Sequence, residues 1–191
     1  MTTEQYLAQE RKAETKSEYV DGLVYAMAGA GLAHVQIALN IGAALRALLR
    51  NSTCRPLAMD MRVRVPDSRL YAYPDVVIAC GELELEDDEL DTLLNPVVIF
   101  EVLSPSTEAW DRGRKFKRYA TIPSLIEYVL VSQSDARVER FVREGEDWRL
   151  SIFEGLEAKL QLESVGIELP LSEIYDRVEF EEESRPTGGV R

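Results

Sequence analysis

Two carboxylates stand on segments whose composition predicts strands of a sheet interior. Asp75 follows Pro74 at the start of the β-branched run VVIAC, and Glu101 interrupts the apolar run VVIFEVL. Burying an ionised carboxylate without a partner costs several kcal/mol, so Glu101 must be paired, protonated or used in chemistry. A charged loop separates the two segments. Carboxylates on neighbouring strands can therefore converge.

Two uses of such a pair are open. Converging carboxylates with a main-chain carbonyl make an all-oxygen site suited to Mg²⁺ or Mn²⁺, which keep several waters and accept phosphate oxygens. In the other interpretation, Asp75 belongs to a turn and Glu101 pairs with an arginine such as Arg62 or Arg64. Spacing alone does not decide between them.

The helix expected after Glu101 carries a third component. Asp111, Lys115 and Tyr119 are four residues apart, and each step of four drifts by about 40° around a helix, so the three share one face. Because only SPST separates the strand from the helix, the Lys115 ammonium can reach back to position a water or neutralise charge on a phosphate. The alternative is a solvated helix face with an ordinary Asp111–Lys115 pair.

Charge is distributed unevenly along the chain. It has 34 acidic and 22 basic residues and a formal net charge of -12, which argues against a protein that coats nucleic acid through a global positive field. A polyanion must therefore bind to a local patch of positive charge. The same helix holds the dense basic cluster of the sequence, and its candidates for contacting nucleic acid are Arg112, Arg114 and Arg118.

Length and composition fit one domain with its own core, since the chain has 191 residues, of which 46% are hydrophobic. Cys54 and Cys80 match neither a disulfide framework nor a metal-site spacing, so we expect two buried thiols in a reducing compartment. The N-terminus lacks a basic start followed by an apolar core, and no apolar run approaches the roughly 20 residues that span a bilayer. We expect a soluble, cytoplasmic protein without membrane contact.

Several elements must position these residues. Residues 2–13 predict a helix with a capping box at its start, and Asp21-Gly22 predicts a tight turn between two short strands. Apolar residues that recur at intervals of three and four residues predict a long helix over 32–49. Strict alternation in LAMDMRVRV, residues 57–65, predicts one half-buried strand.

The central block organises the expected sheet. The runs YPDVVIAC, NPVVIFEVL and LIEYVLVSQ predict strands, and the helix over 104–124 joins the last two as a crossover unit with both faces covered. In residues 137–169, apolar and polar side chains alternate within segments that glycines separate, which predicts an antiparallel meander. A short helix is expected to follow in LSEIYDRV. We expect a single domain over 1–180 and a disordered tail over 181–191.

Two parts of the sequence resemble a known family. PD at 74–75 with EVL at 101–103 resembles the PD-(D/E)xK nuclease signature, which is short and weakly specific. The longer block EVLSPSTEAWDRGRKFKRYATIPSLIEYVLV resembles the Uma-type family of restriction endonucleases. SEYVDGLVYAMAGAGLAHVQIALNIGAAL is similar to the family's N-terminal glutamate, Asp-Gly turn and histidine-bearing helix. The similarity covers roughly residues 1–150.

The resemblance implies a fold and a chemistry. The fold is restriction-endonuclease-like, α/β (α+β), with a mixed central β-sheet flanked by helices and additional antiparallel strands. The chemistry is Mg²⁺-dependent hydrolysis of phosphodiester bonds in nucleic acid, with DNA as the expected partner and Mn²⁺ as a substitute metal. Asp75 and Glu101 become the metal ligands, with the carbonyl of Val102 as a third.

One departure from the superfamily signature matters, because its lysine position holds Leu103. In the Uma-type family the amine comes from the following helix. The family's D...K...Y pattern falls on Asp111, Lys115 and Tyr119. The resemblance therefore assigns the catalytic amine to Lys115 ahead of Lys117, with Asp111 and Tyr119 as accessory residues.

Three further residues are considered for the site. Glu18 matches the family's early glutamate and is an additional acidic member of the site. His34 is the only histidine of the sequence; on an apolar helix a lone histidine is more often packed or hydrogen-bonded than catalytic, so it enters as an accessory residue. Asp60 is expected to be exposed or salt-bridged rather than a metal ligand.

Three functions are compatible with these residues. The first is a metal-dependent endonuclease, and the alternative is a catalytically inactive nuclease-fold module that binds or regulates. A hydrolase of smaller phosphoesters is the third, although its basic helix would be oversized. Nucleases that cut two strands often pair, so a homodimer is expected by analogy.

Overall fold

Local signals at the N-terminus form the elements that they predict. The computed structural model describes residues 1–66 and 69–180. Helix α1 (Thr3–Glu10) begins with the capping box of Thr2 and Gln5. Asp21 and Gly22 both have positive φ, as a type I′ turn requires, and join β1 (Ser17–Val20) to β2 (Leu23–Ala26).

The remaining elements follow in the order that the sequence indicates. The other strands are β3 (Cys54–Ala58), β4 (Arg62–Val65), β5 (Leu70–Ala72), β6 (Val76–Cys80), β7 (Thr92–Leu93), β8 (Val98–Val102), β9 (Glu127–Val131), β10 (Arg137–Glu144), β11 (Asp147–Glu154), β12 (Lys159–Leu162) and β13 (Ile167–Pro170). The other helical segments are α2 (Leu32–Leu48), α3 (Glu108–Trp110), the π-helical turn η2 (Asp111–Lys115), α4 (Phe116–Tyr119), the 3₁₀ turn η3 (Glu163–Val165) and α5 (Leu171–Ile174).

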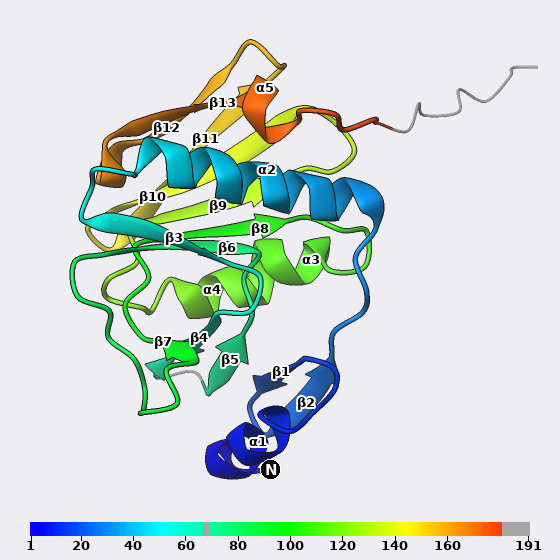
Figure 1. The fold of residues 1–191 in the computed structure, drawn as a ribbon, viewed down its shortest axis with the longest axis vertical. Coiled ribbons are helices and arrows are strands. Elements are labelled where there is room, and N and C mark those ends of the chain that lie inside the picture. Colours follow the sequence, from blue (N-terminus) through cyan, green and yellow to red (C-terminus); the bar gives the residue numbers. More distant parts are fainter. Residues whose placement is uncertain (67–68, 181–191) are drawn as a thin grey trace, which may run out of the picture.

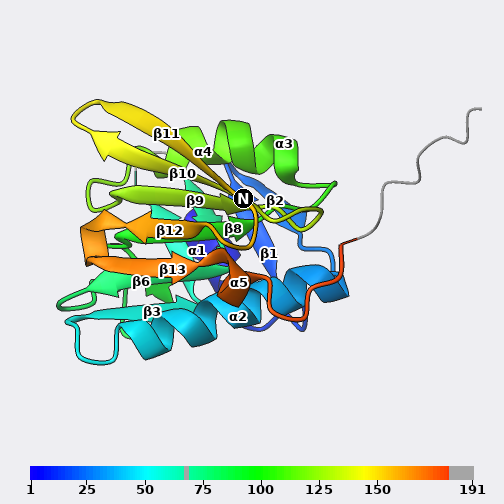
Figure 2. The same ribbon diagram turned by 90° about the horizontal axis from the view of Figure 1, so that it is seen from above.

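A six-stranded mixed sheet, in the order β11-β10-β9-β8-β6-β3, forms the middle layer of the fold. Helix α2, the β12–β13 ribbon and α5 cover one of its faces (Figures 1 and 2). Helices α3 and α4 lie on the other face, and beyond them lies a five-stranded sheet in the order β2-β1-β5-β4-β7 (Figure 1). The architecture is the predicted mixed α+β fold with helices flanking a mixed sheet.

The central strands β6, β8 and β9 of the middle sheet are buried on both faces, which explains their nearly continuous apolar sequences. In β8, Phe100 and Val102 pack into the core under α2, whereas Ile99 faces the α3–α4 side. Strands β8 and β9 are parallel and are joined through α3, η2 and α4. The predicted crossover unit is confirmed, and it sets Glu101 on the same face as Ile99, beneath the crossover helix.

The expected single strand over 57–65 is wrong. Met59 adopts a φ of 68° and donates its backbone N–H to the Asp75 carbonyl, so β3 ends there and β4 continues in the other sheet. Arg62, placed by alternation on a polar face, is 2% exposed and donates to Thr92 and Tyr73. Alternation reports one exposed face, but it cannot show that the chain changes sheets within the pattern.

Helix α2 is confirmed, and its apolar residues are divided between a buried and an exposed side. Ile37, Ile41 and Leu45 are buried, whereas Leu32 and Leu39 are exposed. The stripe at 37, 41 and 45 has a helical period and faces the middle sheet. The exposed leucines lie on the outer side of the helix.

The C-terminal half and the cysteines differ in part from expectation. Strands β9, β10 and β11 form an antiparallel meander, but β12 and β13 pair separately. Cys54 and Cys80 face each other across β3 and β6 and are joined by a disulfide, so the expectation of two free thiols is wrong. Cysteine usage therefore no longer indicates a reducing compartment.

No helix within residues 1–66 and 69–180 has the length and apolar character needed to cross a membrane. The expected disorder of residues 181–191 lies outside the described part of the chain, and a single domain over 1–180 stays a prediction.

Candidate active site

Strand register brings the two candidate metal ligands together. Strands β6 and β8 are antiparallel, with Val76 opposite Phe100. Continuing this register by one residue places Asp75 opposite Glu101, and directly opposite residues point to the same side of a sheet. The two carboxylates therefore share the face that the crossover helix covers.

Glu101 is buried, and its carboxylate has two partners from the crossover helix. Glu101 is 4% exposed. Its Oε1 lies 2.9 Å from Lys115 Nζ and accepts a hydrogen bond of 3.1 Å from the Tyr119 hydroxyl. The alternative pairing with Arg62 or Arg64 is wrong, because these arginines pair with acids of the β6–β8 loop instead, at 2.8 Å and 2.9 Å.

Lys115 collects carboxylates from three separate parts of the chain. Besides Glu101, its Nζ lies 3.1 Å from Glu18 Oε1 and 3.3 Å from Asp111 Oδ1. Lys115 is 5% exposed, so the interpretation of this helix face as a solvated surface is wrong. Lys117 is exposed instead. The sequence prediction that Asp111, Lys115 and Tyr119 share a face holds, and Glu18 joins them through β1.

The segment that bears Asp111 and Lys115 is a π-helical turn rather than an α-helix. Such turns are rare and occur frequently at functional sites. The Tyr128 hydroxyl, from β9, donates to the Asp111 carbonyl at 3.1 Å. Sequence reasoning missed Tyr128, because it lies in a strand whose pattern indicates only burial.

Asp75 is held by two partners on its two oxygens. Oδ2 accepts a hydrogen bond of 2.7 Å from the Val102 backbone N–H, and Oδ1 lies 2.7 Å from His34 Nε2. His34 stands in the first turn of α2. The general expectation that a lone histidine is hydrogen-bonded is met, but its partner is a residue of the candidate site.

The pKa of His34 reflects its contact with Asp75. Burial lowers the pKa of His34, but the hydrogen bond and the charge of Asp75 outweigh it, so the pKa lies above the ordinary 6.5. The pair therefore stabilises the fold fully below pH 6.5, and this contribution is lost as the pH rises through the raised pKa. In an NMR titration we expect Asp75→Asn to lower the His34 pKa by about one unit or more, because burial stays while the partner's charge is gone.

The matched control is Asp60→Asn. Asp60 is exposed and pairs with Lys16, as its expected exposed or salt-bridged role requires. This substitution should leave the His34 signal unchanged. An unshifted His34 in Asp75→Asn would contradict the contact. Since His34 is the only histidine of the chain, the assignment of the signal is unambiguous.

Negative charge exceeds positive charge in the buried cluster. Burial raises the pKa of Glu101 well above its ordinary value, and the charges of Asp111 and Asp75 add to this effect against the opposing Lys115. Burial also raises the pKa of Asp111. For Lys115, burial alone lowers the pKa, but attraction to Glu101 and the other anions outweighs it and raises the pKa well above 10.5. The Lys115 ammonium therefore stays charged beside Glu101 and Asp111, whose raised pKa values favour their protonated forms.

The donor set fits a divalent cation. No group of three or more His, Cys, Asp or Glu side chains within the described part of the chain is arranged to hold a metal ion. Mg²⁺, however, is commonly held by one or two carboxylates and keeps its waters. Asp75 and Glu101 supply such a pair, and the contacts of Glu101 described above involve Oε1. Asp111 Oδ1 is a further buried carboxylate oxygen of the cluster; it accepts no hydrogen bond and is compensated by the charge of Lys115 alone, at 3.3 Å.

Residues 3–172 match the Uma2 family, described as "Putative restriction endonuclease". The chain belongs to the Uma2 family. Two relatives from Synechocystis are the uncharacterized proteins slr1290, 31% identical over 94% of each chain, and sll1609, 33% identical over 87% of this chain and 95% of that one. A crystal structure titled as a putative nuclease belonging to DUF820 from Anabaena variabilis matches with a TM-score of 0.75, 14% identity, and coverage of 92% and 97%. Its likeness shows that the two proteins share the mixed α+β fold described above.

The basic residues of the crossover helix are only partly available in this Uma2 protein. Arg112 pairs with Glu108 at 2.7 Å and also with Glu139, and Arg118 pairs with Asp21. Arg114 is exposed and makes no ion pair with a described residue. The local patch expected from the sequence is thus weaker than its residue count indicates.

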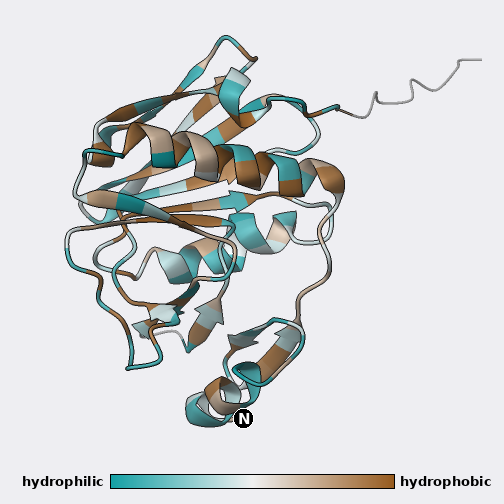
Figure 3. Ribbon diagram, in the orientation of Figure 1, coloured by the Kyte–Doolittle hydropathy of each residue, from teal (hydrophilic) through white to brown (hydrophobic). Residues whose placement is uncertain are grey.

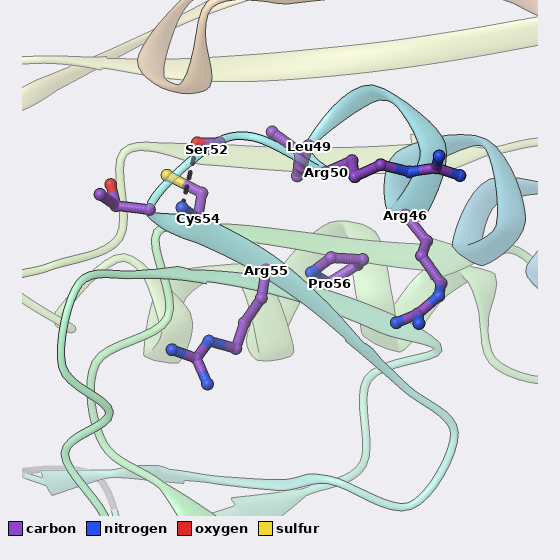
Figure 4. A pocket seen from close by; sticks show the side chains of 8 residues that line it. Arg46, Leu49, Arg50, Ser52, Cys54, Arg55 and Pro56 are labelled. Atoms are coloured by element: carbon purple, nitrogen blue, oxygen red, sulfur yellow. Dashed lines mark hydrogen bonds between the residues drawn. The ribbon is translucent and has the colours of Figure 1, made fainter.

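A second group of arginines lies at the far end of α2. A hollow of about 540 Å³ is lined by Arg46, Arg50 and Arg55 with Ser52 and Thr53 (Figure 4). Arg46 is twelve residues beyond His34 on the same helix, which at 1.5 Å per residue is about 18 Å along the axis. These cations are therefore remote from the carboxylate cluster.

Proposed function

We propose that this protein is a metal-dependent endonuclease that hydrolyses phosphodiester bonds of nucleic acid, with DNA as the expected substrate. One observation carries the proposal. A buried lysine on the crossover helix contacts a carboxylate that lies opposite a second carboxylate in the sheet, on the scaffold of a family described as restriction endonucleases. We also propose that the protein is cytoplasmic and that it forms a homodimer, which presents two active sites to a duplex.

Each residue of the cluster has a role in this reaction. Asp75, Glu101 and the Val102 carbonyl would hold Mg²⁺ or Mn²⁺. A cation bound there supplies Lewis-acid activation of a water and neutralises the phosphate. Lys115 orients the attacking water or neutralises charge that develops on the phosphate, since its ammonium is fixed beside Glu101.

The surrounding residues position these groups. Tyr119 donates to Glu101 and fixes the direction of its carboxylate, while His34 does the same for Asp75. Glu18 and Asp111 hold the Lys115 ammonium in place. On the outer surface, Arg114 and the exposed Lys117, with Arg112 and Arg118 released from their acids, would contact phosphates of the nucleic acid.

A nuclease test separates this function from its rival. Plasmid and single-stranded substrates with Mg²⁺ or Mn²⁺ should be cleaved. Asp75→Asn should lower the rate at least about 100-fold, because loss of a ligand costs no less than the roughly 10- to 100-fold typical of residues that support the ligands. Asp60→Asn changes an exposed carboxylate and should leave the rate unchanged. Cleavage that Asp75→Asn does not reduce would remove Asp75 from the site.

The rival function is a nuclease-fold module that binds or regulates without chemistry. It is favoured by the net charge of -12 and by the contacts of Lys115 with three carboxylates. Calorimetry with Mg²⁺ and Mn²⁺ discriminates between them. A catalytic site binds the ion through Asp75 and Glu101, so the heat should vanish in Asp75→Asn, whereas an inactive module requires no binding at all.

A further inference from the structure

A ribbon of ten consecutive residues is exposed and carries no charge, although the chain is rich in charged residues. Residues 23–32, LVYAMAGAGL, comprise β2 and the segment that leads to α2, and all ten are exposed. Leu23 is 60% exposed, Tyr25 52% and Leu32 85%. Figure 3 shows β2 as an apolar edge strand of its sheet. A continuous apolar surface of this kind marks a binding site.

Two points of this uncharged ribbon lie close to residues of the catalytic cluster in the fold. Tyr25 lies directly opposite Glu18 in the β1–β2 register, so their side chains share a face with Cβ atoms about 5 Å apart. Glu18 contacts Lys115 at 3.1 Å. At the other end, Leu32 precedes His34 by two residues and lines a hollow of about 1270 Å³ with Leu103 and Ser104, which follow the strand of Glu101.

Few basic residues near the cluster are free to hold the backbone of a duplex, since Arg114 and Lys117 are the only exposed basic residues of the described crossover helix. Arg112 and Arg118 are in ion pairs, and the arginines of Figure 4 lie at the far end of α2. Duplex recognition depends on many cations that neutralise phosphates. Unpaired nucleotides offer exposed bases instead, and bases stack on aromatic side chains without needing positive charge.

We propose that the ribbon of residues 23–32, centred on Tyr25, binds unpaired bases beside the scissile phosphate. The substrate class is then single-stranded or locally unpaired nucleic acid. This inference rests on the proposed nuclease function, and it makes Tyr25 a positioning residue. The Tyr25 ring lies on the side of the hairpin that bears Glu18. A base stacked on this ring would place its neighbouring phosphate towards Lys115.

The test is binding of a single-stranded oligonucleotide that carries 2-aminopurine, measured in EDTA so that no cleavage occurs. Stacking on Tyr25 should quench the fluorescence. Tyr25→Ala should weaken binding roughly 10-fold, whereas Tyr25→Phe, which keeps the ring, should bind as the original protein does. Ile152→Ala removes an apolar side chain of similar exposure on β11 and should have no effect. In cleavage assays, Tyr25→Ala should raise KM for single strands more than it lowers kcat.

The outcomes separate this inference from the proposed function. Quenching that depends on the Tyr25 ring, in a protein that cleaves nothing, would support the binding surface and overturn the nuclease. Metal-dependent cleavage with equal effects of Tyr25→Ala and Ile152→Ala would overturn the surface alone. A second copy of the chain could cover β2 instead. Sedimentation that shows a dimer dissociated by Tyr25→Ala, without any change in oligonucleotide binding, would therefore overturn the inference.

Discussion

Lys115→Met is expected to lower the free energy of unfolding by about 3–5 kcal/mol at pH 8, the usual cost of removing one partner from a buried ion pair. The methionine fills a similar volume, but Glu101, Glu18 and Asp111 lose the ammonium that lies within 3.3 Å of each. Of these, Glu101 and Asp111 are then buried without that compensation. Urea denaturation at pH 8 measures the loss, and cleavage activity should disappear with it.

The pH dependence of this loss identifies its cause. Without Lys115 the already raised pKa values of Glu101 and Asp111 rise further, so the folded state holds protons that the unfolded state releases above about pH 4.5. The destabilisation should therefore shrink as the pH falls towards 5. Lys117→Met makes the same chemical change two residues away on an exposed side chain and should change stability by less than about 0.5 kcal/mol. Equal stabilities of the two variants at pH 8 would show that the carboxylates do not need Lys115.

The fold could be predicted where local chemistry decides the outcome. The capping box of Thr2, the positive-φ turn at Asp21-Gly22 and the period of α2 are properties of a few neighbouring residues. The change of sheet at Met59 is different. It depends on a hydrogen bond to the carbonyl of Asp75, which is near in space but not in sequence, and an alternating pattern continues through it unchanged.

The residues of the candidate site could be predicted from the sequence, but the contacts among them could not. The spacing of Asp111, Lys115 and Tyr119 gives their common face, because that follows from helical geometry alone. The family resemblance supplied Glu18, whose position on β1 has no local signal of function. Neither source indicated the π-helical turn or the Tyr128 hydroxyl beneath it, since both depend on how the crossover helix packs on the sheet.

Glu101→Gln is expected to abolish cleavage and yet leave the metal-free protein as stable as before, or more stable, at pH 8. Burial with the charges of Asp111 and Asp75 raises the pKa of Glu101. Between pH 4.5 and this raised pKa the folded state binds a proton that the unfolded state lacks, so stability falls as the pH rises. Glutamine keeps the acceptor for Tyr119 but carries no charge, so it removes this cost. Activity should fall at least about 100-fold, because a metal ligand is lost.

Glu139→Gln is expected to change the stability at pH 8 in the opposite direction. Glu139 is also buried, but hydrogen bonds from Arg112 and Arg137 outweigh its burial and lower its pKa. Its carboxylate therefore stabilises the fold above pH 4.5 and loses that contribution only as the pH falls through the lowered pKa, so the amide should destabilise at pH 8. Added Mg²⁺ should raise the unfolding midpoint of the original protein but not that of Glu101→Gln. If Glu101→Gln instead loses several kcal/mol at pH 8 without metal, the carboxylate serves as a structural partner of Lys115 rather than as a ligand kept for a cation.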